Sequence, residues 1–156
     1  MEIVFITTPL GIAKIIGDEH GISEITILKE DELTSKIPEV LQECVTQLQQ
    51  YFDGKRTQFD FKINPKGTDF QQKVWQELLN IPFGKTISYL DLSKKLGDPK
   101  AIRAAATANG KNPLWIVIPC HRVIGTDGSL TGYAGGLWRK KWLLEHENPS
   151  KQQTLF

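Results

Sequence analysis

Several residue types are scarce in this chain of 156 residues, and each scarcity excludes a class of protein. Cys44 and Cys120, the two cysteines, lie in such different sequence contexts that we expect no disulfide between them. Two cysteines and three widely spaced histidines also do not form the ligand cluster of a structural zinc site. No apolar run reaches the roughly eighteen residues of a membrane span, and no basic and then apolar leader opens the sequence. We therefore predict a cytoplasmic protein with no metal, cofactor or membrane partner.

Net charge is also small, at +1 for the whole chain, but it is unevenly distributed. Residues 1–66 include 7 basic and 11 acidic side chains, whereas residues 67–156 include 12 basic and 7 acidic ones. Only the second part, with a net charge of +5, is suited to a polyanion such as DNA. The sign changes at the turn-forming segment Asn64–Gly67, so we predict two domains, residues 1–66 and 67–156.

The first part of the chain reads as a small sheet with one helix. After Pro38, apolar residues recur every three or four positions until Asp53, which is typical of an amphipathic helix. Cys44 lies on the apolar side of that helix and reads as an ordinary core residue. Phe59–Ile63 is a further candidate strand. Short runs separated by turn-forming residues predict an antiparallel meander of three strands, Glu2–Thr8, Gly11–Ile16 and Ile22–Lys29.

The second part begins with helix signals. Thr68 with Gln71 forms a capping-box pattern, and Ser88 with Asp91 marks a second helix that ends at Gly97. A third helix starts after Asp98, with proline at its first position. Two helices joined by so short a turn suggest helix-turn-helix, although any helical hairpin uses the same signals.

The third helix is rich in alanine, and Ile102 and Arg103 are its bulkiest residues. Such a helix can approach another surface closely. Packing against a neighbouring helix and contact with nucleic acid are both consistent with the composition. Arg103 favours nucleic acid, because a long guanidinium on an alanine surface can enter a groove or a gap in a base stack.

The chemical centre follows a short apolar run, Leu114–Ile118, which reads as a buried strand ended by Pro119. Cys120 then stands beside His121 and Arg122, and this positive environment favours the nucleophilic thiolate. Because consecutive side chains diverge in extended backbone, His121 would act as a base through a water molecule.

The imidazole of that histidine also needs an orienting acceptor on its other ring nitrogen. Glu145 and Glu147 are the candidates, near the end of a predicted helix over Leu137–His146. The sequence pattern does not choose between these two carboxylates.

Several motifs in order and at matching spacing across residues 68–147 resemble the O6-alkylguanine-DNA alkyltransferases. The resemblance rests on Ile118–Val123 with Asn112-Pro113 before it, on Ser88-Tyr89 and Arg103, and on Gly132–Gly136 and Leu143–Glu147. It implies an α+β protein with a ribonuclease H-like N-terminal domain and a winged helix-turn-helix C-terminal domain. It further implies methylated-DNA–protein-cysteine S-methyltransferase activity without a cofactor, in a single-use reaction that restores guanine.

The resemblance also assigns catalytic roles. Cys120 would accept the alkyl group, His121 would act through water, Glu147 would orient His121, Asn112 would shape the turn and Tyr89 would donate a proton to the departing guanine.

DNA-binding and substrate-binding roles follow from the same resemblance. The partner would be double-stranded DNA that carries O6-alkylguanine, chiefly O6-methylguanine and also O4-methylthymine, bound through its minor groove by a monomer. Arg103 would fill the gap left by the flipped nucleotide. DNA contacts are assigned to Arg103, Ala104, Thr107 and Ser88, and substrate contacts to Val123, Tyr133, Ala134 and Trp115. Carbonyls of Cys120 and Val123 would accept from the guanine exocyclic amine.

Some features depart from the family pattern or have simpler explanations. Ala134 stands where many relatives carry serine, so only backbone amide would bind the alkylated oxygen. The four tryptophans, Trp75, Trp115, Trp138 and Trp142, read as core residues. Arg139–Lys141 reads as a solvated helix face, with phosphate contact as the alternative. The tail Gln152–Phe156 is similar to peptides that dock on sliding clamps, and a disordered or self-packed end is the alternative.

Three other functions compete with alkyl transfer. Alkyltransferase-like proteins bind alkylguanine but lack the acceptor thiol, which Cys120 supplies here. A winged-helix transcription factor would not need Cys120, Asn112 and Tyr89 together. A cysteine hydrolase would turn over and would be indifferent to alkylated DNA.

Overall fold

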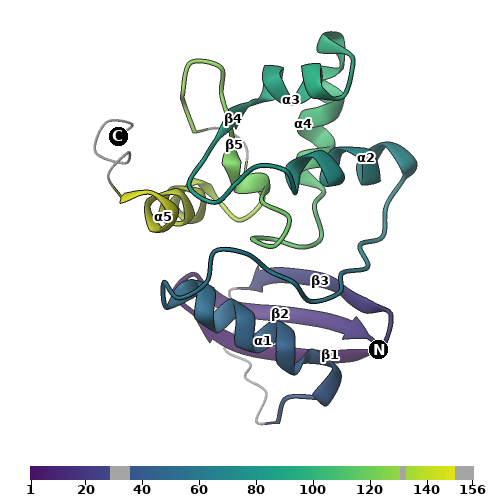
Figure 1. Cartoon of the computed structure of the whole chain (residues 1–156), viewed down its shortest axis with the longest axis vertical. Helices are drawn as coiled ribbons and strands as arrows, with labels where there is room; N and C mark the ends of the chain where they lie inside the picture. The colour runs from purple at the N-terminus through teal and green to yellow at the C-terminus, as the bar shows by residue number, and fades with distance from the viewer. Residues whose placement is uncertain (29–35, 131–132, 150–156) are drawn as a thin grey trace. The chain divides into compact units, whose positions relative to one another are not determined.

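The computed structural model describes residues 1–28, 36–130 and 133–149, which belong to two compact units (Figure 1). One unit contains Met1–Lys66, and the other contains Gly67–Asn112 and the chain from Ile116 onward. The sequence predicted two domains, each made of one continuous stretch of chain. In the structure one short segment departs from this division, because Pro113–Trp115 groups with the first unit.

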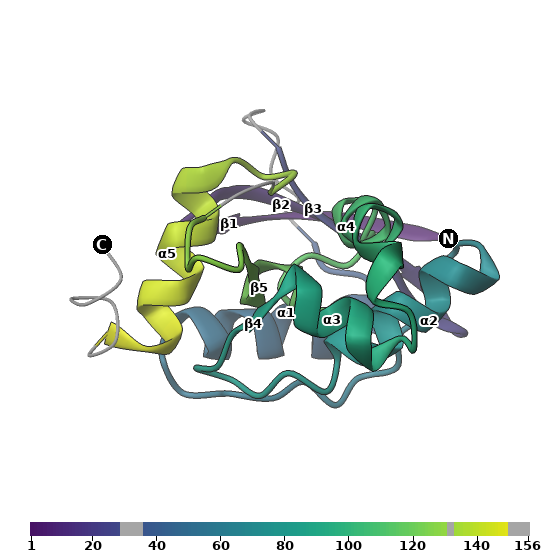
Figure 2. The ribbon, with the colours of Figure 1, turned by 90° about the horizontal axis from the view of Figure 1, so that it is seen from above.

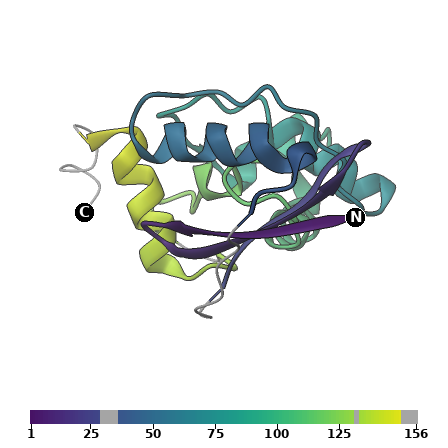
Figure 3. The same ribbon diagram turned by 90° about the horizontal axis from the view of Figure 1, so that it is seen from below.

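The first unit is an antiparallel sheet of β1 (Glu2–Thr8), β2 (Gly11–Asp18) and β3 (Gly21–Leu28), in that order. The predicted meander is therefore confirmed. The helix α1 (Glu39–Phe52) lies over one face of this sheet, as Figure 3 shows from below. Buried residues of that helix, Leu41, Cys44, Val45 and Leu48, share the core with the inward-pointing strand residues Val4, Ile15 and Ile25. Cys44 is thus a core residue, as predicted.

Two predicted strands are wrong as strands, because only single bridges form among these residues. Ile63 bridges Ile22, and Leu114 bridges Ile25, whose N–H donates to the Pro113 carbonyl oxygen over 2.8 Å. The run Leu114–Ile118 cannot continue as a strand because Ile116 has a φ of 76°, a conformation that a β-branched residue rarely adopts.

The second unit is mainly helical (Figure 2). Thr68 and Gln71 form the predicted capping box, and the Ser88 side chain accepts from the Asp91 N–H. The predicted third helix begins instead with a 3₁₀ turn, η1, and becomes α-helical at Ile102. Its elements in chain order are α2 (Asp69–Leu78), β4 (Ile87–Ser88), α3 (Tyr89–Lys95), η1 (Pro99–Ala101), α4 (Ile102–Gly110), η2 (Cys120–Arg122), β5 (Val123–Ile124) and α5 (Leu137–Glu147).

The helix α4 packs against both α2 and α3. Ala105 and Ala108 are buried on it, and their small side chains allow a close approach. Trp75 of α2 is buried and donates from its indole Nε1 to the Ala108 carbonyl oxygen over 2.9 Å. The alanine-rich helix therefore does pack on its neighbours, but only along one side.

A short parallel pair of strands connects the start of α3 to the segment after Cys120. Ile87 of β4 pairs with Val123 of β5, and Ser88 pairs with Ile124. Because Tyr89 directly follows β4, this pairing sets the first residue of α3 beside the cysteine turn. In the described ranges, no helix is long and apolar enough to cross a membrane.

Candidate active site

The segment around Cys120 is the short 3₁₀ turn η2, followed directly by β5. The Arg122 N–H donates to the Pro119 carbonyl oxygen over 3.0 Å, and the Cys120 N–H donates to the Ile118 carbonyl oxygen over 2.8 Å. The side chains of Cys120, His121 and Arg122 are all buried. The thiol is therefore held on a compact, internally hydrogen-bonded turn.

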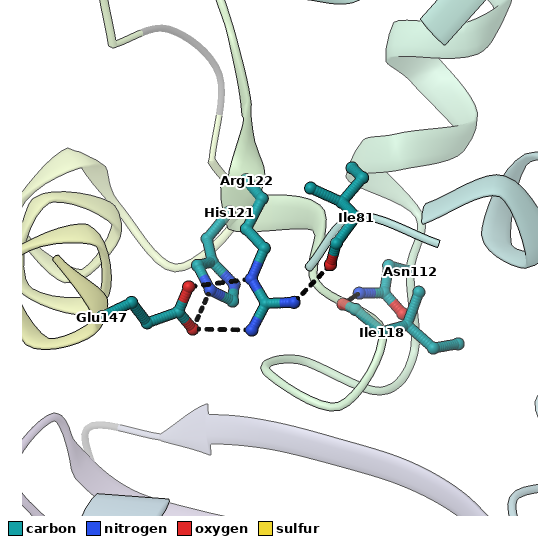
Figure 4. Close-up of polar contacts among 6 residues, drawn as sticks. All are labelled: Ile81, Asn112, Ile118, His121, Arg122 and Glu147. Atoms are coloured by element: carbon teal, nitrogen blue, oxygen red, sulfur yellow. Dashed lines mark hydrogen bonds and ion pairs between the residues drawn. The ribbon is translucent and has the colours of Figure 1, made fainter. Parts of the chain in front are cut away.

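Burial raises the pKa of the Cys120 thiol to about 11, because the thiolate loses its hydration. A hydrogen bond from the Asn112 side chain and the positive charge of Lys140 act in the opposite direction. Asn112 also donates from Nδ2 to the Ile118 carbonyl oxygen over 2.7 Å (Figure 4). The prediction that neighbouring His121 and Arg122 favour the thiolate needs correction, since burial dominates and Lys140 is the cation that opposes it.

The other two side chains of the turn meet Glu147 of α5 (Figure 4). His121 Nε2 lies 2.8 Å from Glu147 Oε2. Arg122 donates from Nε to Oε1 over 2.8 Å and from Nη2 to Oε2 over 3.0 Å, which makes a bidentate pair. Its remaining Nη1 donates to the Ile81 carbonyl oxygen over 2.7 Å. Glu145, the alternative carboxylate, instead pairs with Lys141 at 3.8 Å.

The buried charges of this cluster compensate one another. Burial lowers the pKa of His121, and the attraction of Glu147 offsets that effect only in part because Arg122 and Lys140 add to it. The pKa of Glu147 lies well below its usual range: burial alone would raise it, but His121 and Arg122 outweigh burial. His121 is consequently a neutral imidazole at pH 7, beside a carboxylate that stays ionised.

A neutral imidazole that donates from Nε2 to the carboxylate has Nδ1 free as an acceptor. Nδ1 of His121 is buried and has no hydrogen-bond partner among the described residues. The structure shows no direct hydrogen bond between this nitrogen and the neighbouring thiol. The arrangement can therefore take up a proton at Nδ1, provided that a small molecule such as water carries it there.

A pocket of about 660 Å³ opens beside α4 in the second unit. Four of the predicted site residues, Tyr89, Arg103, Tyr133 and Ala134, contribute to its wall. Burial raises the pKa of the Tyr133 phenol well above its usual value, so this hydroxyl stays protonated. The pocket is lined by Tyr89, Ile102, Arg103, Ala106, Gly110, Tyr133 and Ala134.

The predicted DNA-contacting residues of α4 lie on its exposed side. Arg103, Ala104 and Thr107 are exposed, and the Thr107 hydroxyl donates to the Arg103 carbonyl oxygen over 3.0 Å. Ser88 is half-buried, and its side chain caps α3. The helix thus presents a small, open surface next to the pocket.

Two residues predicted to bind substrate do not line this pocket. Trp115 belongs to the first unit, where its N–H donates to the Ile25 carbonyl oxygen over 3.0 Å. Val123 is buried, and its carbonyl oxygen accepts a hydrogen bond from Lys140 Nζ over 2.6 Å. The Cys120 carbonyl oxygen likewise accepts from Asn109 Nδ2, over 3.4 Å.

Lys140 is the main polar residue whose predicted environment was wrong. It was predicted to lie on a solvated face, but its side chain is 0% exposed. Its Nζ lies 5.7 Å from the centre of the Tyr89 ring. Burial lowers the pKa of Lys140 to about 8, although Cys120 acts against this shift. A cation with a lowered pKa therefore lies near Tyr89 and interacts electrostatically with Cys120.

The tryptophans divide into two groups. Trp75 is buried, as predicted, whereas Trp138 is 55% exposed and lies under the Arg139 guanidinium at 4.5 Å. Trp142 is half-buried and stacks on His146 with ring centres 4.9 Å apart. The two aromatic residues of α5 are one turn apart in sequence, but they face solvent and a histidine more than the core.

Some predictions concern residues outside the described ranges. The clamp-like tail Gln152–Phe156 lies there, as does Gly132 of the glycine-rich motif. Within the described residues, no three His, Cys, Asp or Glu side chains gather as a metal ion would require.

Comparison with known families explains this combination of features. A model of the "6-O-methylguanine DNA methyltransferase, DNA binding domain" matches residues 69–149. A second model, of the "6-O-methylguanine DNA methyltransferase, ribonuclease-like domain", matches residues 3–65. The chain belongs to the 6-O-methylguanine DNA methyltransferase family. Membership covers both units and confirms the resemblance that the Cys120 motifs indicated.

Individual relatives of this methyltransferase family agree over most of the chain. The methylated-DNA–protein-cysteine methyltransferase of Methanosarcina barkeri is 43% identical over 150 residues, which cover 91% of this chain and 94% of the relative. The crystal structure of the Mycobacterium tuberculosis O6-methylguanine methyltransferase superposes with a TM-score of 0.85 at 41% identity, covering 95% of this chain and 93% of that one. A structure of the M. tuberculosis OGT in complex with DNA has a TM-score of 0.84 at 43% identity and covers 97% of both chains.

Proposed function

We propose that this protein repairs DNA by moving the alkyl group of O6-alkylguanine, chiefly a methyl group, to the thiol of Cys120. The observation that carries the proposal is the set of groups around that thiol. Asn112 contacts it, a neutral His121 with a free buried acceptor follows it, and Glu147, itself held by Arg122, fixes that histidine. Relatives that cover nearly the whole chain are named for the same transfer.

The pocket supports a mechanism in which the damaged nucleotide leaves the helix. Its volume of about 660 Å³ is large enough for a nucleobase, and it lies beside an exposed helix face made of small residues. An alkyl carbon inside a duplex is out of reach of a buried thiol, so the nucleotide must be flipped at a cost of a few kcal/mol. In our proposal α4 enters the minor groove, and Arg103, which lines the pocket, fills the gap in the base stack.

The buried thiol loses its proton as it reacts. With a pKa of about 11, Cys120 is overwhelmingly protonated at pH 7 in the free protein. His121 Nδ1 takes this proton through a water molecule, while Glu147 holds the other side of the ring and stabilises the imidazolium that forms. The sulfur then attacks the alkyl carbon, so that a carbon–sulfur bond forms as the bond to guanine O6 breaks.

Tyr89 completes the transfer by protonating the leaving group. Its side chain lines the pocket, where its phenol donates a proton to the guanine ring nitrogen so that a full anion never develops. The proton held by His121 restores the phenol. In total, the thiol proton ends on guanine and the alkyl group ends on sulfur.

The thioether product resists hydrolysis, so each molecule reacts once. A single addition distinguishes this function from that of a cysteine hydrolase, which would turn over. The thiol of Cys120 distinguishes it from a module that only binds alkylated DNA.

The test is intact-protein and peptide mass spectrometry after incubation with a duplex that contains one O6-methylguanine. We expect one added methyl group, on the peptide that bears Cys120 and not on the peptide that bears Cys44, with no further addition at excess substrate. Binding of the duplex without an adduct would overturn the transfer and leave only recognition.

Three finer features belong to the same proposal. The protein would act as a monomer in the cytoplasm, and on the nucleoid if its source is a prokaryote. O4-methylthymine would be a further substrate, and at Ala134 only backbone amide would bind the alkylated oxygen. Docking of Gln152–Phe156 on a sliding clamp stays a prediction, and unchanged clamp affinity after deletion of these five residues would remove it.

A further inference from the structure

Asn109 is a second asparagine that touches the cysteine turn, and neither the family motif nor the mechanism above uses it. It lies in the last turn of α4 and is only 2% exposed. Its Nδ2 donates to the carbonyl oxygen of Cys120 over 3.4 Å. Its Oδ1 is buried and has no hydrogen-bond partner among the described residues.

The position of Asn109 on α4 connects two surfaces. Arg103, Ala106 and Gly110 of this helix line the pocket, whereas Ala105, Ala108 and Asn109 form its buried side. The helix that we propose to enter DNA is therefore attached, through one amide, to the peptide that carries the thiol. A shift of α4 would move the hydrogen-bond donor of the Cys120 carbonyl.

An asparagine that merely filled space would be a poor choice at this position. A buried acceptor without a partner lowers stability, and a leucine of similar size would fill the volume without one. Polar groups kept at such a cost are concentrated at functional sites. Asn109 Oδ1 and His121 Nδ1 are the buried side-chain atoms that lack partners in the described part of the chain, and both belong to residues at the Cys120 turn.

We propose that Asn109 is a positioning residue for alkyl transfer: its amide holds the Cys120 carbonyl so that the placement of α4 on DNA sets the placement of the thiol. The inference rests on the proposed function and deepens it. Together Asn112 and Asn109 restrain the backbone on both sides of the reacting sulfur, at the Ile118 and Cys120 carbonyls.

The first test compares Asn109→Leu with the unchanged protein. We expect the rate constant for methyl transfer from duplex DNA to fall about tenfold, the scale of one lost hydrogen bond, with an unchanged Kd for the duplex and an unchanged or higher Tm. Transfer from free O6-methylguanine base should fall less, because without DNA the placement of α4 no longer contributes to the placement of the thiol. Lys73→Met is the matched control, since it removes a side-chain bond to the Leu96 carbonyl oxygen elsewhere in the same unit and should leave the rate unchanged.

A second variant, Asn109→Asp, tests the pH dependence of the transfer rate, which a purely structural role of Asn109 would leave unchanged. A protonated carboxyl can donate to the Cys120 carbonyl, whereas a carboxylate repels it, and burial raises the pKa of such a carboxyl. Relative to Asn109→Leu, the aspartate variant should therefore regain transfer rate as the pH is lowered from 8 to 6. Equal rates for Asn109→Leu and the unchanged protein, or identical pH profiles for the two variants, would overturn the inference. Failure of the unchanged protein to take up methyl would instead overturn the proposed function.

Discussion

The two cysteines show how little burial alone says about a thiol. Cys44 on α1 and Cys120 on η2 are both buried, and burial raises the pKa of both, to about 12 and about 11 respectively. Around Cys44, burial is the cause of the shift, and the neighbouring helix residues Leu41, Val45 and Leu48 are apolar. Around Cys120, an amide and an ammonium group oppose it.

The difference therefore lies in the groups that can stabilise a charge while it develops. A thiol in an apolar core stays protonated and inert. The thiol of Cys120 is also protonated at rest, but it has a hydrogen-bond donor, a cation and a neutral imidazole within its own turn or packed against it. This comparison separates a reactive cysteine from a structural one without any appeal to a low resting pKa.

The largest expected effect comes from replacing each sulfur in turn. Cys120→Ser should abolish methyl uptake completely, whereas Cys44→Ser should leave the rate of uptake unchanged. Stability should follow the opposite order, because a serine hydroxyl at position 44 is buried among apolar residues and costs about 1–3 kcal/mol. At position 120 the hydroxyl can bond to Asn112. Mass spectrometry and urea unfolding measure the two effects. A methyl adduct on the Cys120→Ser protein would contradict the assignment of Cys120 as the reactive thiol.

The next expected effect comes from removing the carboxylate behind His121. Glu147→Gln should slow methyl transfer on the order of 10²–10⁴-fold, because the imidazolium is no longer stabilised. It should also lower the free energy of unfolding by about 3–5 kcal/mol, since Arg122 is left as an uncompensated buried charge.

A double variant separates the two consequences. Adding Arg122→Met to Glu147→Gln removes the unpaired charge and should recover a large part of the lost stability, but it should not recover the rate. Single-turnover kinetics and urea unfolding of both proteins provide the measurement. Recovery of rate together with stability would mean that Glu147 serves the fold and not the chemistry.

Most helices and strands could be predicted from short-range patterns in the sequence. The caps at Thr68 and Ser88 and the spacing of the α1 core residues depend on neighbours within a few positions, and the structure contains each of them. The apolar run Leu114–Ile118 was misread because hydrophobicity does not fix backbone direction. The positive φ of Ile116 interrupts the extended backbone inside the run, and the apolar side chains around it carry no signal for that turn.

The spacing of residues along α5 could have decided between Glu145 and Glu147. Leu143 and Leu144 are buried, and Glu147 lies three and four positions beyond them on the same face of α5. Lys140 lies three and four positions before them and is buried as well. The three- and four-residue spacing of the helix could therefore have predicted that Lys140 and Glu147 are buried with these leucines. The charged neighbours of Lys140, Arg139 and Lys141, made a solvated face the simpler interpretation.

Lys140 gives the smallest expected effect, and it tests whether a buried cation contributes to the difference between the two thiols. Its pKa of about 8 lies below the value of about 10.4 for an exposed lysine. Between these pH values the unfolded chain holds a proton that the folded protein has lost, so stability should rise with pH through this window. The gap corresponds to about 3 kcal/mol.

Comparison with Lys140→Met isolates this contribution, because the titration of Cys44 cancels in the difference and the Cys120 thiol, with a pKa of about 11, stays mostly protonated up to pH 10.5. Relative to the variant, the unchanged protein should gain up to about 3 kcal/mol in free energy of unfolding between pH 7.5 and 10.5, as measured by urea unfolding. Methionine keeps the packing of the aliphatic stem but loses the charge and the bond to the Val123 carbonyl oxygen. If the difference in stability stays constant with pH, Lys140 is charged throughout, and the resting Cys120 thiol has a stronger cationic neighbour than its pKa of about 11 implies.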